Sequence, residues 1–556
     1  MQTDIVDTEA LEPGRTSVEP QPIPEAQHTP QPEKDADGTD TGESGPDLSQ
    51  SVAETSTAIH GPRLWLLIAG MMLGVYLVGL DTTMLATVIP TLTDYFGTIS
   101  DVSWYGTSYV IVACVFIPLV GRIFTLFRDK FIYLTFMVIF LIGSIICAVS
   151  TSSSVFILGR AVNGLGSAGL ITGALLVIRA ACEPRIRPAI TSATVALIPL
   201  GSATGPLIAG ALTSRVGWRW CFWIFLPIGG FAIVTTLLIP IPDHMPKPAW
   251  DEAVLSMRTK LDPVGFVLFA GAATSVLLAT TWGGTTYAWS SATIIGLFCG
   301  FAALSVVFTL WILHAGENAL IPPSTFRRRS VTFGSAFMFL QGGATQMISY
   351  YLPYWFQAIK GDSAVWSAIH MLPSILSQIL ALITFGTQVR RFQFIPPWGI
   401  TGSVLSCIGA GLITTFSVHT STGRWIGYQI IASVGRGMAF QVPIISIQET
   451  VPAKETAAAT SVANLFMQFG TAISISASQS IFDNRLPDLL SQYAPDVDAS
   501  AVLNAGATEV RGLVAPSQLP GFLLAYNEAL VIMFYFPVGC SALAALVGFG
   551  LPWNRM

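Results

Sequence analysis

The chain has 556 residues, of which 52% are hydrophobic and only 11% are charged, and its mean hydropathy is +0.63. A soluble domain carries about 25% charged residues, so this composition excludes an ordinary soluble protein. The formal net charge is −5, and no nucleic-acid partner is expected.

The first 60 residues differ from the rest of the chain. They hold thirteen Asp or Glu against Arg15 and Lys34, with many Pro, Ser, Thr and Gly. Such a segment cannot bury enough apolar surface to fold, so residues 1–60 are predicted to be a disordered acidic cytoplasmic tail. They lack the pattern of a cleaved signal peptide, so the first hydrophobic segment is expected to direct insertion.

From Leu64 onward, apolar runs of about 20 residues, long enough to cross a bilayer, recur between short polar breaks. They predict an all-α membrane protein with fourteen transmembrane helices. The runs lie near 64–92, 102–121, 131–149, 155–180, 188–212, 219–240, 262–282, 291–313, 331–356, 366–388, 395–416, 424–448, 456–482 and 526–551.

Basic residues test this count, because Lys and Arg concentrate in cytoplasmic loops. With both termini cytoplasmic, the inner segments receive most of them: Arg63, Arg122, Arg128, Lys130, Arg179, Arg185, Arg187, Lys247, Arg258, Lys260, Arg327, Arg328, Arg329, Arg390, Arg391, Lys454 and Arg555. The outer segments receive only Arg215, Arg219, Lys360, Arg424, Arg485 and Arg511. One missed or extra span would place the later basic loops on the outer side and reverse this asymmetry. The distribution of Lys and Arg therefore favours fourteen spans.

A faint repeat suggests two related halves. "GLGSAG" followed by "EPRIRPAITSA" has a counterpart in "SVGRGMAFQVP" followed by "VPAKETAAATS". The copies fall on spans four to five and twelve to thirteen, which fits two six-span halves with an inserted pair, and repeated halves are typical of transporters with a site at their interface. The predicted domains are 61–245, the inserted helices in 246–325, and 326–556 with an outer loop at about 483–525.

The stretch "LIPLGSATGPLIAGAL" predicts an unusual helix. It carries Gly201, Gly205, Pro206 and Gly210, although in water an interior Gly costs about 1 kcal/mol and Pro about 3 kcal/mol relative to Ala. In a bilayer, small residues four apart, here Gly201, Gly205 and Ala209, let another helix approach to backbone contact. We expect a close-packed fifth helix at the interface of the two halves.

Five motifs, in this order, resemble the signatures of one family. They are "LDTTMLATVIPTL" (80–92), "GRAVNGLGSAG" (159–169), "GSATGPLIAGAL" (201–212), "WRWCFWIFLPIG" (218–229) and "WGGTTYAW" (282–289). The chain resembles the fourteen-span drug:proton antiporters of the major facilitator superfamily, and most closely the fungal toxin and multidrug efflux branch. The resemblance implies the major facilitator fold, and it makes Gly201, Gly205, Pro206 and Gly210 the antiporter motif.

The loop after the second span departs from the superfamily pattern. In "GRIFTLFRDK", Thr125 stands at the usual acidic place and Asp129 is displaced. The inner-gate charge pairing that the family motif implies is therefore in doubt. Gly121, Arg128 and Lys130 are either a loop anchor near lipid phosphates or an ordinary positively charged inner loop.

Charges inside the spans are few. Asp81 is the acidic residue placed well within the hydrocarbon, and Arg160 and Arg436 are the basic ones; such groups are expensive there and mark function by default. Burial and a nearby cation act oppositely on a carboxyl group, so Asp81 is a candidate proton carrier with Arg160 beside it. Arg160 is also expected to hydrogen-bond Asn163 and backbone carbonyls. Its role is then either to hold helices together or to take part in proton coupling, and both interpretations stay open.

A second interpretation of Asp81 stays open. Its carboxylate could simply make a helix-packing hydrogen bond to Thr82, Thr83 or Thr87.

The ligand site is expected to be an apolar, aromatic cavity with a few polar groups, suited to a neutral or weakly polar hydrophobic molecule. Aromatic residues at span ends are also common as interface belts, which is the competing interpretation. The candidate lining residues are Asn163, Gln341, Gln346, Tyr350, Tyr354, Arg436, Gln441, Asn464 and Gln468.

These observations predict a proton-coupled exporter of hydrophobic small molecules such as a toxin, drug or secondary metabolite. Uptake of an organic chelate such as a siderophore is the alternative; a receptor or intramembrane enzyme is disfavoured, because HExxH, GxSxG, Walker and paired-carboxylate motifs are missing. No enzyme activity, cofactor or metal is predicted. We expect a monomer in the plasma membrane, with the vacuolar membrane as the other possibility.

Overall fold

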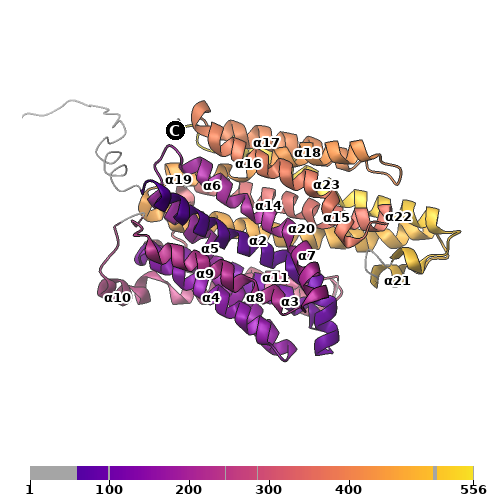
Figure 1. Cartoon of the computed structure of the whole chain (residues 1–556), viewed down its shortest axis with the longest axis horizontal. Coiled ribbons are helices and arrows are strands. Elements are labelled where there is room, and N and C mark those ends of the chain that lie inside the picture. Colours follow the sequence, from indigo (N-terminus) through magenta and orange to yellow (C-terminus); the bar gives the residue numbers. More distant parts are fainter. Residues whose placement is uncertain (1–58, 98–100, 244–245, 285, 505–509, 555–556) are drawn as a thin grey trace, which may run out of the picture. The chain divides into compact units, whose positions relative to one another are not determined.

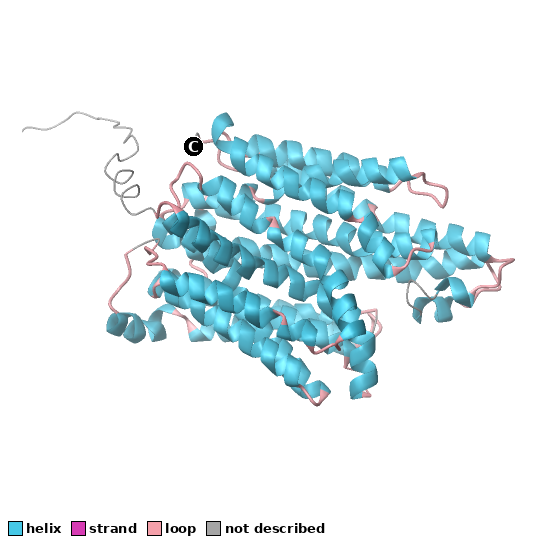
Figure 2. Ribbon diagram, viewed as in Figure 1, coloured by secondary structure: helices cyan, strands magenta, loops and turns pink. Residues whose placement is uncertain are grey.

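The computed structural model describes residues 59–97, 101–243, 246–284, 286–504 and 510–554, and the predicted tail lies almost entirely outside them. The described residues form helices joined by short loops (Figure 2), with one isolated bridge between Gly283 and Tyr287. The helices of the N-terminal group are α2 (Pro62–Phe96), α3 (Val102–Leu126), α4 (Asp129–Val149), α5 (Ser153–Ala181), α6 (Arg187–Val195), α7 (Leu197–Arg215), α8 (Trp220–Trp223) and α9 (Phe225–Leu238).

Three helices separate this group from the next: α10 (Trp250–Lys260), α11 (Pro263–Trp282) and α12 (Ala292–Ala315), with the short 3-10 turn η1 (Gly316–Asn318). The C-terminal group comprises α13 (Pro323–Arg327), α14 (Arg329–Trp355), the π-turn η2 (Phe356–Lys360), α15 (Ala364–His370), α16 (Leu372–Phe392), α17 (Pro396–Ile413), α18 (Thr422–Phe440), α19 (Val442–Thr450), α20 (Ala453–Tyr493), α21 (Ala499–Asn504), η3 (Val510–Leu513), α22 (Leu519–Met533) and α23 (Tyr535–Gly548).

Twelve helical segments of the described chain are long and apolar enough to cross a membrane. They match twelve of the fourteen predicted spans. The other two predicted spans fall on the long helices α14 and α20, which do not qualify as candidates. Both are rich in polar and small residues, such as the Gln341 to Gln346 stretch of α14 and the "AKETAAATS" start of α20.

Within each group, neighbouring helices pack in pairs. In the N-terminal group α4 packs on α5, α2 on α7, and α3 on α5. In the C-terminal group α14 packs on α20, and α17 packs on both α18 and α23. Helices α16, α17 and α18 lie together at the top of the view in Figure 1. Helix α20 runs on to Tyr493, so the predicted outer loop at 483–525 begins inside a helix rather than after it.

The pair α11 and α12 packs together and attaches to α3 and α20 through α11. Asp262, with a left-handed φ of 45°, fixes the base of this pair. Its carboxylate accepts from Gly265 N at 2.8 Å, from Trp311 Nε1 at 2.8 Å and from Leu320 N at 2.7 Å. One side chain thus caps α11, holds α12 and orients the segment that leads to the C-terminal group.

Several contacts between the two groups lie at the end of the bundle that carries Arg122, Arg179 and Arg328, here called the basic end. Arg179 Nη1 donates to Gln448 O and, at 3.1 Å, to Thr456 Oγ1. A hydrophobic cluster joins both groups at this end, with residues such as Ile178 on one side and Ile447 and Val451 on the other. The groups are therefore closed against each other at the basic end.

Candidate functional site

A buried ion pair joins α2 and α5. Arg160 Nη1 donates to Asp81 Oδ1 at 2.6 Å, and the two side chains are 2% and 1% exposed. Arg160 Nε donates to Tyr105 O at 3.0 Å, and its guanidinium stacks over the Tyr109 ring at 4.7 Å. Asp81 Oδ2 is buried without a hydrogen-bond partner among the described residues.

The neighbouring threonines of Asp81 bond elsewhere. Thr82 Oγ1 donates to Gly79 O at 2.7 Å and Thr83 Oγ1 to Leu80 O at 3.4 Å. Asn163 Nδ2 donates to Ser144 Oγ on α4 at 3.3 Å, and the bond from Arg160 to Asn163 expected from the sequence is not seen among the described residues. The carboxylate of Asp81 is thus held by an arginine from another helix, and the purely local threonine bond considered from the sequence is not seen.

The predicted close contact of α7 is made with α2. A Cβ at Gly201 would lie 2.5 Å from Tyr76 O, and one at Gly205 would lie 2.2 Å from Thr83 Oγ1 and 3.1 Å from Leu80 O. Pro206 lies inside the helix, and a Cβ at Gly210 would meet only Thr87, at 4.0 Å. The partner is therefore a helix of the same group, not the opposite one, and Gly210 is not part of the tight contact.

Helix α7 nevertheless reaches the C-terminal group as well, where it contacts α15 and α16, and α6 packs on α16. A Cβ at Gly386 of α16 would lie 2.7 Å from Pro188 O and 2.6 Å from Ser192 Cβ of α6. The fifth predicted span, α6 with α7, therefore lies between α2 and α16.

Arg436 is 1% exposed, midway along the 29-residue segment Thr422–Thr450. Its Nη2 donates to Ser374 Oγ at 2.9 Å and to Ser433 Oγ at 2.6 Å, and its Nη1 to Thr345 O at 3.3 Å. The sequence indicates the arginine but not these serines, because small polar residues inside apolar spans give no distinctive signal.

Three tyrosines gather on α14. The rings of Tyr350 and Tyr354 stack at 5.6 Å, and Tyr351 lies 5.0 Å from Tyr350. Tyr351 OH donates to Ile475 O and Gln479 Oε1 on α20, whereas Tyr350 is 41% exposed. The sequence predicted the tyrosines of this stretch as cavity residues, and in the structure Tyr351 is the one whose hydroxyl bonds α20.

The remaining cavity candidates differ in where their side chains bond: within the C-terminal group, across the two groups, or to none of the described residues in the case of Gln441 Oε1. Gln341 is buried and donates to Ser403 on α17 at 2.8 Å, within the C-terminal group. Asn464 Nδ2 lies 3.5 Å from Thr172 Oγ1 on α5, across the two groups. Gln441 is buried with its Oε1 unpartnered among described residues, and Gln346 and Gln468 are half-buried. The structure does not gather all nine predicted residues at one point.

The loop after α3 is fixed by protein groups. Thr125 Oγ1 donates to Arg122 O, and Lys130 Nζ donates to Leu237 O and Ile239 O. Asp129 is fully buried and pairs with Lys247 Nζ at 3.1 Å. Asp129, although displaced from the expected acidic place, thus has a basic partner, which lies in the loop after α9.

Asp243 completes this loop cluster. Its Oδ1 accepts from Asp129 N at 3.0 Å. Burial raises the pKa of Asp243 above its ordinary value, and burial lowers the pKa of Lys247 below its ordinary value. The cluster therefore joins α4 to the loop after α9 through partly desolvated charges.

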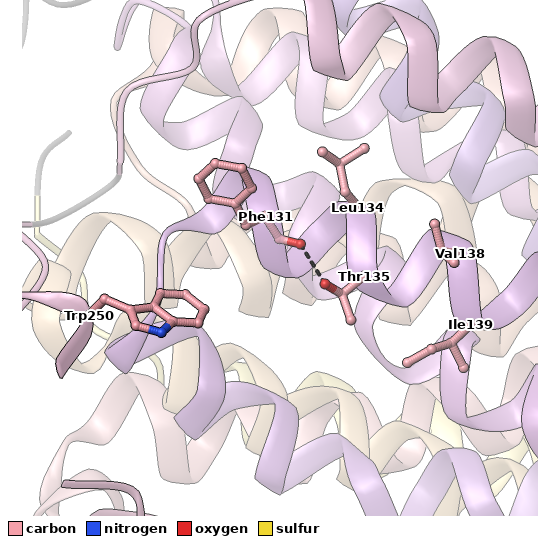
Figure 3. Close-up of a pocket in the computed structure, with 6 residues that line it drawn as sticks. All are labelled: Phe131, Leu134, Thr135, Val138, Ile139 and Trp250. Atoms are coloured by element: carbon pink, nitrogen blue, oxygen red, sulfur yellow. Dashed lines mark hydrogen bonds between the residues drawn. The ribbon is translucent and has the colours of Figure 1, made fainter. Parts of the chain in front are cut away.

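An apolar hollow of about 560 Å³ lies on the outer side of α4, next to α10 (Figure 3). Thr135 Oγ1 donates to Phe131 O at 2.9 Å, so its hydroxyl is satisfied within the helix. Phe131 and Trp250 are 49% and 63% exposed. The lining residues are Phe131, Leu134, Thr135, Val138, Ile139 and Trp250. Such a face is suited to lipid contact, and it contains none of the predicted cavity residues.

Comparisons with known proteins identify the chain. Residues 71–317 match the sequence model of the Major Facilitator Superfamily. The efflux pump mlcE of Penicillium citrinum is 38% identical over 544 residues, which cover 96% of this chain and 97% of that pump. The chain belongs to the major facilitator superfamily. The resemblance predicted from the motifs is confirmed.

Other relatives of this superfamily member are fungal transporters too. The MFS-type transporter pigP of Monascus ruber is 40% identical over 498 residues, covering 89% of this chain and 87% of pigP. The efflux pump aflT of Aspergillus parasiticus is 36% identical over 514 residues, covering 92% and 99%. The chain is thus an efflux transporter and not an enzyme, as the sequence predicts.

Solved structures show the same fold. The proton:xylose symporter XylE, bound to 6-bromo-6-deoxy-D-glucose, superposes with a TM-score of 0.58 at 14% identity, covering 90% of this chain and 97% of XylE. The likeness supports the all-helical major facilitator fold and nothing about substrate.

Proposed function

We propose that this superfamily member is a proton-coupled antiporter that exports hydrophobic small molecules such as toxins or other secondary metabolites. The observation that carries the proton coupling is the buried Asp81–Arg160 pair, which links two helices and leaves one carboxylate oxygen unpartnered among described residues. Named fungal efflux pumps with nearly full-length similarity support the direction of transport.

Asp81 would act as the proton carrier, and Arg160 would set when the proton is bound. Burial disfavours the charged carboxylate and an adjacent guanidinium favours it, while Arg160 itself stays charged at any ordinary pH. A movement of α2 relative to α5 would change the Asp81 to Arg160 distance. Proton uptake and release would then follow the conformational cycle.

Helices α14 and α20 are proposed as the two further spans, giving fourteen in all, with both termini in the cytoplasm. Arg328 bonds Glu455 at 2.8 Å where these two helices begin, and the basic end as a whole carries the charges expected of the cytoplasmic side. The halves are then 61–245 and 326–556, with the inserted pair in 246–325. A monomer in the plasma membrane is proposed.

The substrate path is proposed to run between α14, α18 and α20 of one half and α2, α5 and α7 of the other. The half-buried Gln346 and Gln468 and the exposed Tyr350 offer polar and aromatic contacts on this path. In the described conformation the basic end is closed by contacts such as Arg179 with Thr456. Alternating access then requires these contacts to separate.

The test is flux in proteoliposomes, with a panel of labelled hydrophobic compounds and an imposed pH gradient. We expect at least one compound to accumulate against its gradient while the pH gradient lasts and to leak back when an ionophore collapses it. Accumulation that persists after collapse, or needs no gradient, would refute proton coupling.

A further inference from the structure

Arg436 is a cation in the middle of the bundle that has no acidic partner among the described residues. All its hydrogen-bond acceptors are neutral: two serine hydroxyls and one backbone carbonyl. No acidic side chain in the described part of the chain forms an ion pair with it or acts on its charge. Its Nε is buried and has no partner among the described residues.

The N-terminal group shows what a compensated arginine looks like in the same protein. Arg160 and Arg436 lie on α5 and α18, and each reaches the first long helix of its own group. Arg160 meets a carboxylate there, Asp81 on α2, whereas Arg436 meets only the carbonyl of Thr345 on α14. A buried charge without a counter-charge is costly, so its presence at this depth indicates a functional use.

Besides the three neutral acceptors of Arg436, two buried groups at this point have no hydrogen-bond partner among the described residues. Thr345 Oγ1 has no partner among the described residues, and its hydroxyl can donate, as can Arg436 Nε. A carboxylate takes such donors well, because its two oxygens accept several hydrogen bonds and a guanidinium matches its geometry.

Thr345 also connects Arg436 to a more open part of α14. Thr345 and Gln346 are half-buried, and Ser349 and Tyr350, one turn further along the same helix, are exposed. A molecule that contacts Tyr350 with its apolar body would need to reach only one turn deeper to place an anionic group beside Thr345 and Arg436.

We propose that Arg436 and Thr345 bind the anionic group of the transported molecule, so that the preferred substrates are hydrophobic organic acids in their carboxylate form. This inference rests on the proposed export function and differs from the neutral or weakly polar substrate expected from the sequence. The apolar body would lie against the tyrosines of α14, and the carboxylate would supply the counter-charge that Arg436 otherwise lacks.

The test is equilibrium binding in nanodiscs, with 1-pyrenebutyric acid and its methyl ester as the probe pair. The two probes share one apolar body and differ in charge, and nanodiscs without protein measure partition into lipid. We expect the wild type to bind the acid at least about tenfold more tightly than the ester. Equal binding of both probes, or protein-dependent binding of neither, overturns the proposal.

Variants locate the effect. Arg436→Gln should remove the preference for the acid and leave ester binding unchanged, and Arg436→Lys should keep part of it. Arg424→Gln, an exposed arginine at the start of the same helix, is the matched control and should bind like the wild type. Retained acid preference in Arg436→Gln would overturn the assignment.

Thermal unfolding separates a ligand role from a structural one. Arg160→Gln should lower the melting temperature, because it strands Asp81, whereas Arg436→Gln should leave it unchanged or raise it, because it strands no charge. A large fall in the melting temperature of Arg436→Gln would show that Arg436 is a structural residue and overturn the proposed ligand role. Binding needs no pH gradient, so a failed proton-driven flux assay would reject the antiport mechanism without touching this result.

Discussion

Arg160 Nη1 lies 2.6 Å from Asp81 Oδ1, and both side chains are almost fully buried between α2, α3 and α5. The second carboxylate oxygen has no described partner, while Arg160 is further held by Tyr105 O and the Tyr109 ring. The arginine is thus anchored and the carboxylate is the less constrained member of the pair. A proton would therefore be gained and lost on the acidic side without the arginine leaving its anchors.

Asp81→Asn should abolish proton-driven accumulation while downhill exchange persists. Asparagine keeps the shape and can still accept from Arg160, but it cannot titrate, so alternating access would continue without coupling. The measurement compares uphill and downhill flux in the same vesicles. Asp498→Asn, in the exposed segment after α20, is the control and should behave like the wild type.

If Asp81→Asn still concentrates substrate in response to a pH gradient, the proton is carried elsewhere and Asp81 is a packing residue. Arg160→Lys should shift the pH dependence of flux, because lysine keeps the charge but loses the planar fork of donors. An unchanged pH profile in Arg160→Lys would argue against its role beside the carrier.

Gly205→Leu should destabilise the protein by about 1 to 3 kcal/mol, the usual cost of overpacking, and sharply reduce export. A side chain there would meet Thr83 and the α2 backbone. Gly210→Leu is the matched control, since a Cβ there meets only Thr87 at 4.0 Å. Thermal unfolding and flux are measured for both, and equal effects of the two leucines would disprove a specific contact at Gly205.

The all-helical fold and twelve of the predicted spans follow well from the sequence, because a bilayer permits little besides helix and the apolar runs have the length of a span. The exceptions are instructive. Helices α14 and α20 are too polar to qualify on composition, and α20 continues past the predicted end of its span to Tyr493. Whether such polar helices form inside the bundle depends on their packing against neighbouring helices, and a hydropathy average does not measure that packing.

The candidate site could be predicted only in part. Intramembrane charge singled out Asp81, Arg160 and Arg436, and the structure pairs the first two. The sequence alone could not show that Gly201 and Gly205 approach α2, since a stripe of small residues permits close packing against any neighbouring helix. The serines around Arg436 were missed for the same reason: a hydroxyl in an apolar span carries meaning only once its partner is known.

Cysteine labelling tests the proposed topology. In a background without the seven native cysteines, we expect Arg327→Cys to react with an impermeant maleimide from the cytoplasmic side and Gln492→Cys from the outer side. Both positions are exposed, and the 41-residue helix α20 separates the two ends by about 60 Å. Labelling of both from one side would contradict the fourteen-span arrangement.

The loop cluster predicts a pH-dependent stability. Because burial raises the pKa of Asp243, the folded state holds this proton more tightly than the unfolded one, so Asp243 costs stability as pH rises through its folded pKa. Asp243→Asn keeps the acceptor for Asp129 N and removes the charge. The melting temperature of the variant minus that of the wild type should increase as pH rises from about 4 toward neutrality. A difference that does not change with pH would contradict this prediction.

The contact between Asn464 and Thr172 tests whether the basic end must open. The two side chains approach to 3.5 Å from α20 and α5, about two turns of α5 from Arg179, whose bonds join the same groups. With Thr172→Cys and Asn464→Cys in the cysteine-free background, a short bifunctional methanethiosulfonate reagent should link the two helices and reduce flux to background.

Reduction of the link should restore transport, and each single-cysteine variant treated in the same way should keep its activity. A transporter that alternates between two openings must separate this contact once per cycle, whereas a link within one rigid group would leave transport unchanged. Full flux in the linked protein would show that α5 and α20 stay together throughout the cycle. The substrate would then have to pass by another route than the one proposed between the two groups.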